Sequence, residues 1–175
     1  DKITRRFGDP VTHFARLGEP YPKPLLGYKD HGHAIDSRTE LEMITLRQAD
    51  IPDEYLDASG VHLCPIDFMT HSLLPAVFRQ AGLTTITLDP ASGYMTPTFF
   101  NDIPSLITGL TAFLPAEEDL RALFEGHSDD LWEMAEALAA YGCETIVIKR
   151  GERGQWLYDA ASGSRWEIPA YPARL

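Results

Sequence analysis

Short apolar runs alternate with helical patterns from Val61 onward, and this alternation restricts the fold more than any other feature. The runs are VHLCP (61–65), TTITLDP (84–90), TAFLP (111–115) and ETIVIK (144–149). Between them lie segments with helical spacing, such as AEEDLRALF, in which Leu120, Leu123 and Phe124 fall at i, i+3 and i+4. Strands separated by helices predict parallel βαβ units, hence an α/β fold of three α/β/α layers with a mostly parallel, doubly wound sheet and helices on both faces.

Helix boundaries are predicted from capping residues. In residues 70–82 we expect Ser72 to be the N-cap, Pro75 to lie in the first turn and Gly82 to end the helix. In residues 128–142 we expect Ser128 to be the N-cap and Gly142 to stop the helix. A further helix is predicted within FFNDIPSLITGL, which follows a loop punctuated by glycine and proline.

The two ends of the chain differ from this core. QWLYD and RWEIP flank AASGS, which predicts a β-hairpin near the C-terminus. Residues 1–60 are rich in proline and glycine and predict a partial lid or edge layer, not an independent domain, whereas residues 61–175 predict the α/β core. Within the first part, LEMITLR (41–47) is a possible edge strand, through which a homodimer could form.

Composition limits the class of protein. The 175 residues are 44% hydrophobic, enough for one sizeable core, and carry a net charge of −11 with a pI near 4.8. A nucleic-acid-binding surface is therefore not expected, because such surfaces are basic. No apolar run approaches the roughly 20 residues of a membrane span, and no signal segment opens the chain, so we expect a soluble cytoplasmic protein. We expect Cys64 and Cys143 to be reduced, mostly buried thiols.

Charged residues follow each predicted strand. They are Asp67, Asp89, the acids Glu117, Glu118 and Asp119, and the loop KRGERG (149–154). Because parallel strands end at one edge of a sheet, we expect these groups to gather there. Carboxylates beside a glycine-rich cationic loop suit a magnesium-nucleotide site, in which Arg153 could contact a phosphate. Each feature alone also has an ordinary structural explanation, namely a turn or acids that complement a helix dipole.

Other candidate residues are weaker. In DHGHAID, the side chains of Asp30, His31, His33 and Asp36 could suggest a metal cluster, but a solvated polar loop is favoured. His62 lies within a predicted strand, and we expect a hydrogen-bonded core histidine. Ser162 and Ser164 lie in the hairpin loop without a histidine or aspartate partner, so no nucleophile is assigned.

The order of these motifs resembles the ribokinase-like (PfkB) carbohydrate kinase family over about residues 44–175, best between Val61 and Tyr158. The resemblance implies a ribokinase-like fold. It also implies ATP-dependent phosphorylation of a hydroxymethyl group on a sugar or related small molecule such as a nucleoside, with ATP and Mg²⁺ as cofactors.

Family motifs carry over onto particular positions. The Asn-x-x-Glu motif that orders magnesium and phosphates falls on Ala116 and Asp119, so the resemblance assigns the metal role to Asp119, with Glu118 as a substitute. The nucleotide loop falls on KRGERG, so that Lys149, Gly151, Arg153 and Gly154 would border the nucleotide. Lys149 stands where the family commonly has threonine.

The family's catalytic base belongs to a Gly-Ala-Gly-Asp segment, which the resemblance locates beyond Leu175. No catalytic residue is therefore assigned within this chain, and we expect the chain alone not to turn over. Ala116 in place of asparagine motivates an alternative, a non-catalytic sugar- or nucleotide-binding relative of the same fold. A third interpretation keeps only a doubly wound domain that binds some phosphate-bearing ligand.

Overall fold

The computed structural model describes residues 2–7, 9–14 and 45–171, in two compact units, Asp1–Thr45 and Leu46–Leu175. In the first unit, β1 (Lys2–Phe7) and β2 (Asp9–Phe14) pair antiparallel, with Lys2 opposite Phe14. This ribbon is not predicted from the sequence. The DHGHAID cluster lies outside the described residues, as do the first four residues of LEMITLR, and the last three residues of that segment form no strand.

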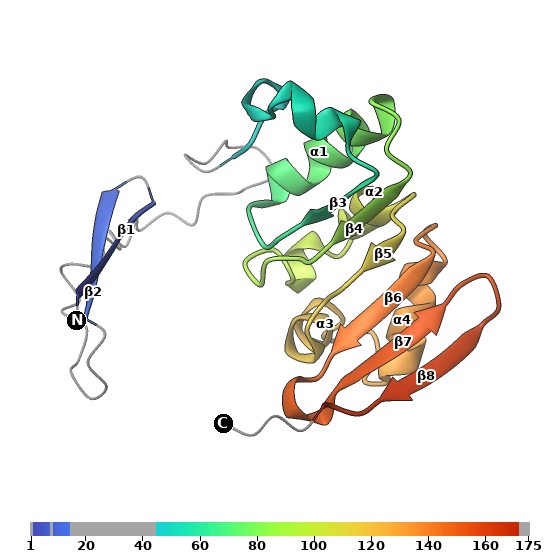
Figure 1. Ribbon diagram of the computed structural model, residues 1–175. Coiled ribbons are helices and arrows are strands. Elements are labelled where there is room, and N and C mark those ends of the chain that lie inside the picture. The colour runs from blue at the N-terminus through green and yellow to red at the C-terminus, as the bar shows by residue number, and fades with distance from the viewer. Residues whose placement is uncertain (1, 8, 15–44, 172–175) are drawn as a thin grey trace. The chain divides into compact units, whose positions relative to one another are not determined.

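The second unit is built on a six-stranded sheet (Figure 1). Its strands, in spatial order, are β3 (Gly60–Leu63), β4 (Thr85–Leu88), β5 (Ala112–Phe113), β6 (Thr145–Lys149), β7 (Gln155–Asp159) and β8 (Ser164–Ile168). The first four strands are parallel, and β7 and β8 form an antiparallel hairpin beside β6. The predicted α/β class, the mostly parallel sheet and the C-terminal hairpin are therefore confirmed.

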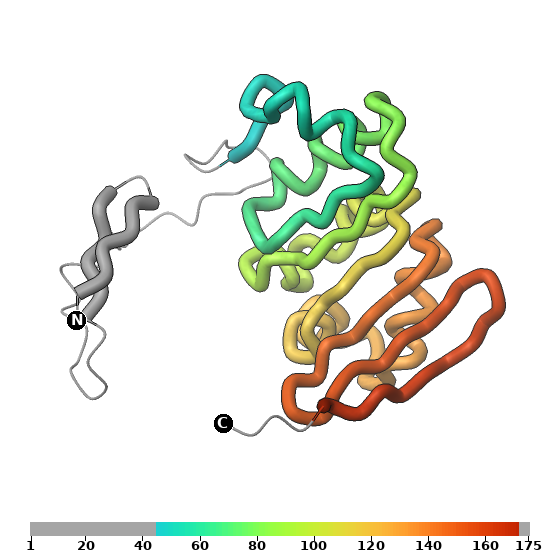
Figure 2. The backbone as a smooth tube through the Cα atoms, in the orientation of Figure 1, coloured from blue at the N-terminus to red at the C-terminus, as the bar shows by residue number. Residues whose placement is uncertain are grey.

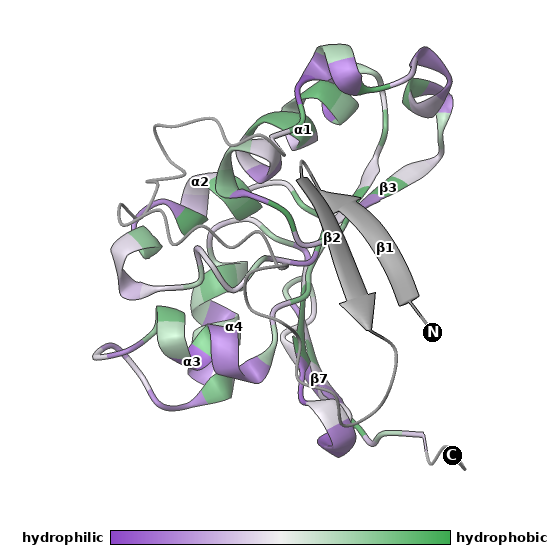
Figure 3. Cartoon of the chain, turned by 90° about the vertical axis from the view of Figure 1, so that its left-hand side faces the viewer, coloured by the Kyte–Doolittle hydropathy of each residue, from purple (hydrophilic) through white to green (hydrophobic). Residues whose placement is uncertain are grey.

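Four α-helices connect the parallel strands: α1 (Phe68–Gln80), α2 (Ile103–Ile107), α3 (Glu117–Leu123) and α4 (Leu131–Ala139). Short 3₁₀ turns complete the unit: η2 (Gln48–Asp50), η3 (Asp53–Asp57), η4 (Pro97–Phe99) and η5 (Gly151–Arg153). Because the spatial order of β3 to β6 follows the chain, right-handed crossovers keep successive helices on the same face. Figure 3 accordingly shows α1 to α4 on one side of the sheet, whereas helices on both faces are predicted from the sequence.

The N-caps differ from those predicted. Helix α1 is capped by Asp67, whose carboxylate accepts from the backbone N–H of Thr70, whereas the hydroxyl of Ser72 donates to a carbonyl one turn back. Pro75 consequently lies inside the helix. Helix α4 is capped by Asp130, not by Ser128. In both cases the chain has two nearby residues that can cap, and the one at the actual end of the helix does so.

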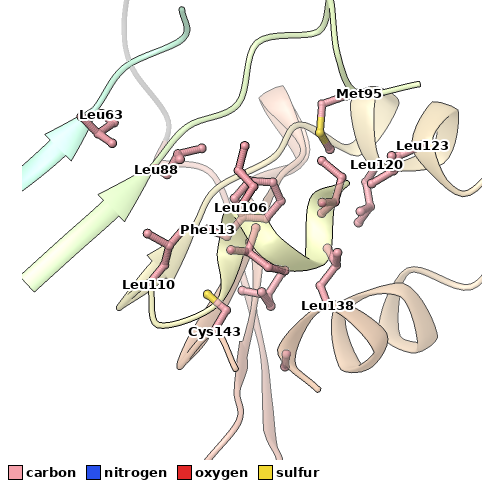
Figure 4. Packing of buried hydrophobic residues seen from close by; sticks show 14 of the residues in the cluster. Leu63, Leu88, Met95, Leu106, Leu110, Phe113, Leu120, Leu123, Leu138 and Cys143 are labelled. Atoms are coloured by element: carbon pink, nitrogen blue, oxygen red, sulfur yellow. The ribbon is translucent and has the colours of Figure 1, made fainter. Parts of the chain in front are cut away.

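The hydrophobic core lies between the sheet and the helices (Figure 4). Leu88 and Phe113 point into it from the sheet, and Leu120 and Leu138 meet them from α3 and α4. Cys143 is buried, and burial raises the pKa of its thiol to about 11. Cys64, by contrast, is exposed, so the prediction of a buried thiol is wrong there, because the residue follows the end of β3.

His62 is hydrogen-bonded as predicted, with its Nδ1 2.8 Å from Oγ1 of Thr87, but it is exposed. Its neighbour Leu63 faces the core instead, because alternate strand residues point to opposite faces. Within the described residues, none of the helices has both the length and the apolar character that crossing a bilayer requires.

Candidate functional site

The parallel strands β3 to β6 end at one edge of the sheet, as predicted, and the backbone can be followed through their exits in Figure 2. Asp67, after β3, is used structurally, because its carboxylate also accepts from the hydroxyl of Thr70 at 2.5 Å. The remaining exits provide Asp89, the first turn of α3 and the loop 149–154.

Lys149 forms an ion pair across this edge. Its ammonium lies 2.6 and 2.5 Å from the two carboxylate oxygens of Asp89. Since β5 lies between β4 and β6, the pair spans the exit of β5. The backbone N–H of Lys149 also donates to the carbonyl of Pro115 at 2.9 Å. The side chain of Lys149 remains 40% exposed, so it is still accessible to a ligand.

Glu117 holds three arginines. Its Oε1 accepts from Nε and Nη2 of Arg121, both at 3.0 Å, and its Oε2 accepts from Nε of Arg150 and Nη2 of Arg153, both at 2.8 Å. The Glu117 side chain is only 8% exposed. Burial alone would raise its pKa, but the bonds from Arg150 and Arg121 and the charges of Arg150 and Arg153 lower it overall. Glu117 therefore stays ionised and ties the loop to α3.

The two glycines of the loop have different roles in the structure. Gly154 has φ +85°, and a Cβ there would lie 2.0 Å from the carbonyl oxygen of Ile168, so close backbone packing requires glycine. Gly151 has φ +59° with no atom within 4 Å of a Cβ position. The turn at Gly151 is therefore open on its outer side, where a ligand can approach the backbone.

An aromatic column supports the loop from the side. The guanidinium of Arg150 lies 4.2 Å over the ring of Trp156, which stacks on Trp132 with centroids 4.5 Å apart and planes 5° from parallel. Arg165 covers Trp132 at 5.4 Å and pairs with Glu136. We call these two indole rings and two guanidinium groups the Arg–Trp column.

A pocket of about 230 Å³ lies beside this column. It is lined by Arg150, Arg153, Trp156, Glu167, Ile168 and Pro169. Both polar and apolar groups therefore border the loop on the side of the hairpin.

The acids predicted to bind a metal lie at the start of α3. Asp119 is partly exposed and Glu118 is exposed, whereas the N-cap residue Ala116 makes no side-chain capping bond. Residues 45–171 bring no three histidine, cysteine or acidic side chains close enough together to hold a metal by themselves. A Mg²⁺ ion bound with phosphates usually takes one or two carboxylates and keeps water, so Asp119 suits that kind of site.

A buried polar pair lies behind the edge. The ring of His71 is fully buried, and its Nε2 donates to the carbonyl of Cys64 at 3.0 Å. Its Nδ1 is then the acceptor for the hydroxyl of Tyr94, 2.6 Å away in the loop after Asp89. Burial lowers the pKa of His71 and raises that of Tyr94, so both stay neutral. The pair fixes the loop that follows β4.

Two elements of this site are missed by sequence reasoning. Glu117 is predicted as one of the strand-exit acids that suit a magnesium site, but not as the partner of three arginines, and the pairing of His71 with Tyr94 joins residues 23 positions apart. The strand exits themselves are predicted correctly. The assignment of nucleotide and metal contacts to Lys149, Gly151, Arg153, Gly154, Asp119 and Glu118 stays a prediction.

Known proteins resemble the chain over most of its length. A cytidine kinase of Thermococcus kodakarensis is 28% identical over 155 residues, which covers 84% of this chain and 51% of the kinase. The chain thus spans about half the length of this curated relative. No protein-family model matches the sequence.

Solved structures show the same fold. A PfkB protein from Polaromonas sp. has a TM-score of 0.53 at 21% identity, over 71% of this chain and 45% of that protein. A protein described as a ribokinase II from E. coli, in complex with ATP and Mg²⁺, has a TM-score of 0.55 at 16% identity, over 72% of this chain and 42% of that protein.

Proposed function

Starting from its ribokinase-like fold, we propose that this chain is the nucleotide-side part of an ATP-dependent kinase that phosphorylates a hydroxymethyl group on a sugar or nucleoside. The observation that carries the proposal is the position of the loop 149–154. It lies at the carboxyl edge of the parallel sheet, beside the exit of β5, with the turn at Gly151 open. Ligands of open α/β sheets bind at this edge. A cytoplasmic location is part of the same proposal.

In this proposal, the loop and the half-exposed cations hold the donor phosphates. The backbone at Gly151 can approach a phosphate closely, and Lys149 and Arg153 supply charge while keeping their carboxylate partners. Gly154 acts indirectly, by allowing the loop to pack against residues 168–170. Phosphoryl transfer depends mainly on such positioning and charge stabilisation.

Asp119, with Glu118 beside it, would hold Mg²⁺ together with the phosphates. Bound Mg²⁺ neutralises charge on the transferred group. A similar E. coli protein was solved with ATP and Mg²⁺, which supports this choice of cofactors. Because the chain is similar to the cytidine kinase named above, nucleosides are the first acceptors to test, beginning with cytidine.

Isothermal titration of the chain with ATP and Mg²⁺ tests the proposal. We expect binding, and about tenfold weaker binding for Lys149→Met, because a charge-assisted contact contributes about 1.5–3 kcal/mol and each 1.4 kcal/mol is tenfold in affinity. Arg79→Met is the matched control, since Arg79 bonds to Thr108 and Gly109 at the opposite edge of the sheet. The proposal would be contradicted if ATP and Mg²⁺ did not bind even in the presence of cytidine, ribose or other nucleosides and sugars.

A non-catalytic sugar- or nucleotide-binding relative is the second candidate. Two observations favour it: Ala116 offers no polar side chain at the start of α3, and Lys149 is already paired with Asp89. This candidate predicts nucleotide or sugar binding by the whole protein without phosphorylated product. Product formation with any acceptor, measured by mass spectrometry, would exclude it.

A further inference from the structure

The cations of the loop 149–154 are each paired with a carboxylate of a neighbouring strand exit. Two of these pairs converge on one side chain, Glu117, which lies one residue after the N-cap of α3. We propose that Glu117 is a positioning residue for the donor nucleotide, which sets the conformation of the loop 149–154 through Arg150 and Arg153. The proposal rests on the proposed function, and in it Glu117 makes no direct contact with the nucleotide.

The contacts of Glu117 explain why its role is indirect. Both carboxylate oxygens are occupied by guanidinium groups, two bonds to each oxygen, and the side chain is 8% exposed. A phosphate would be repelled by this carboxylate and cannot reach it. Glu117 therefore acts on the donor only through the residues that it holds.

Glu117 holds the loop at two points, through two arginines that differ in exposure. The Arg150 side chain is 16% exposed and lies over Trp156, so it anchors the start of the turn in the interior. The Arg153 side chain is 59% exposed and ties down the end of the turn. Between the two lies Gly151, where the backbone is open to a ligand.

The turn is also held by its own backbone bonds, by the stacking of Arg150 on Trp156 and by the packing of Gly154 against residues 168–170. Within it, the N–H of Arg150 donates to the carbonyl of Gly154, and the N–H groups of Arg153 and Gly154 donate back to Arg150 and Gly151. If the charge of Glu117 is removed, Arg150 loses the partner that compensates for its burial. Leaving a buried charge unpaired is strongly unfavourable, so we expect the loop to move until Arg150 reaches water.

Substitution of Arg121 distinguishes a positioning role of Glu117 from a general structural role. It bonds to Oε1 of Glu117 and to the carbonyl of Asp129, and its described contacts include none with the loop. If Glu117 merely stabilised α3, removal of Arg121 would have the same consequences as removal of the charge of Glu117. If Glu117 positions the loop, removal of Arg121 leaves the loop attached.

The test compares Glu117→Gln and Arg121→Gln in the full chain, with Glu125→Gln as the matched control at an exposed acid after α3. Hydrogen exchange without nucleotide reports the loop itself. We expect exchange of the Arg150, Arg153 and Gly154 amides to quicken at least about tenfold in Glu117→Gln, and less than about twofold in the other two. Titration with ATP and Mg²⁺ should show about tenfold weaker binding in Glu117→Gln only, which corresponds to the loss of one charge-assisted bond.

Each outcome decides the question. Unchanged exchange in Glu117→Gln, or equal effects in Arg121→Gln, overturns the positioning role while the proposed function stands. If the wild-type chain binds no ATP, the proposed function fails, and so does a role toward the nucleotide, although the exchange measurement still shows whether Glu117 holds the loop. If Glu117→Gln does not fold, Arg150→Lys replaces it, because lysine keeps the charge but loses the directed Nε–H bond, and the same loop exchange is expected.

Discussion

At the scale of single residues, Gly154 shows how the loop is fitted to the hairpin. Its backbone passes against residues 168–170 in a left-handed conformation. We expect Gly154→Ala to destabilise the chain by about 2–5 kcal/mol, the sum of left-handed strain and overpacking. Gly163→Ala should lower stability by only about 1–2 kcal/mol, because Gly163 is also left-handed, at φ +66°, but has free space around it. Urea unfolding of both variants measures the difference, and equal losses would contradict the packing explanation.

His71 gives the stability a dependence on pH. Burial lowers its pKa below the ordinary 6.5, against the opposing effects of the Cys64 carbonyl and of Asp67 and Asp89. Below pH 6.5, His71 therefore binds a proton in the unfolded chain but stays neutral in the folded chain. The contribution of His71 to the free energy of unfolding is complete above pH 6.5 and is lost as the pH falls through the lowered pKa of the folded state.

We accordingly expect the free energy of unfolding to decrease from pH 7.5 to pH 5, with a shallower decrease in His71→Gln, which has no group to titrate there. Urea titrations at several pH values measure the two slopes. Exposed His127, changed to Gln, is the control and should keep the wild-type slope. Equal slopes in wild type and His71→Gln would show that His71 is not responsible.

At the scale of elements, helix α4 depends on its cap. The carboxylate of Asp130 accepts from the backbone N–H groups of Trp132 and Glu133. We expect Asp130→Ala to cost about 1 kcal/mol, measured by thermal or urea unfolding. Asp129→Ala should cost about 0.5 kcal/mol or less, because Asp129 is exposed and contributes its backbone carbonyl, not its carboxylate, to the bond with Arg121. The reverse order would mean that Asp130 is not the effective cap.

The elements could be predicted from local pattern, but their ends could not. Residues 144–149 are rich in β-branched side chains, and residues 128–142 repeat their apolar positions at helical spacing, so each pattern identifies one kind of element. Capping depends on backbone angles that the sequence does not display, and for this reason Ser128 and Asp130 could not be told apart. The two-stranded ribbon of residues 2–14 gave no such signal.

For the candidate site, the location could be predicted from the sequence, but the ion-pair partners could not. Strand order in a βαβ unit brings successive exits to one edge, which located Asp89 and the loop 149–154 correctly. Partner choice was not predictable, because it depends on register and side-chain reach across strands. The pairing of Lys149 with Asp89, 60 residues away, and of Glu117 with Arg150 and Arg153 are of this kind.

At the scale of the whole molecule, stability depends on the short central strand β5. Phe113, one of its two residues, is fully buried between β4 and β6. Phe113→Ala should cost about 3–5 kcal/mol, a large part of the 5–15 kcal/mol by which folded domains are stable. Leu73→Ala on the exposed side of α1 is the control and should change stability by about 0.5 kcal/mol or less. A comparable loss in both, by urea unfolding, would contradict this view of the core.

The Arg–Trp column has an optical consequence. Two indoles stacked nearly parallel share their electronic excitations, so the pair of Trp132 and Trp156 should give a split circular dichroism band that disappears in Trp132→Phe. Since Arg150 lies over the outer face of Trp156, displacement of the loop would change the polarity around that indole. The chain thus contains its own chromophore beside the loop, and movement there can be observed without attaching a dye.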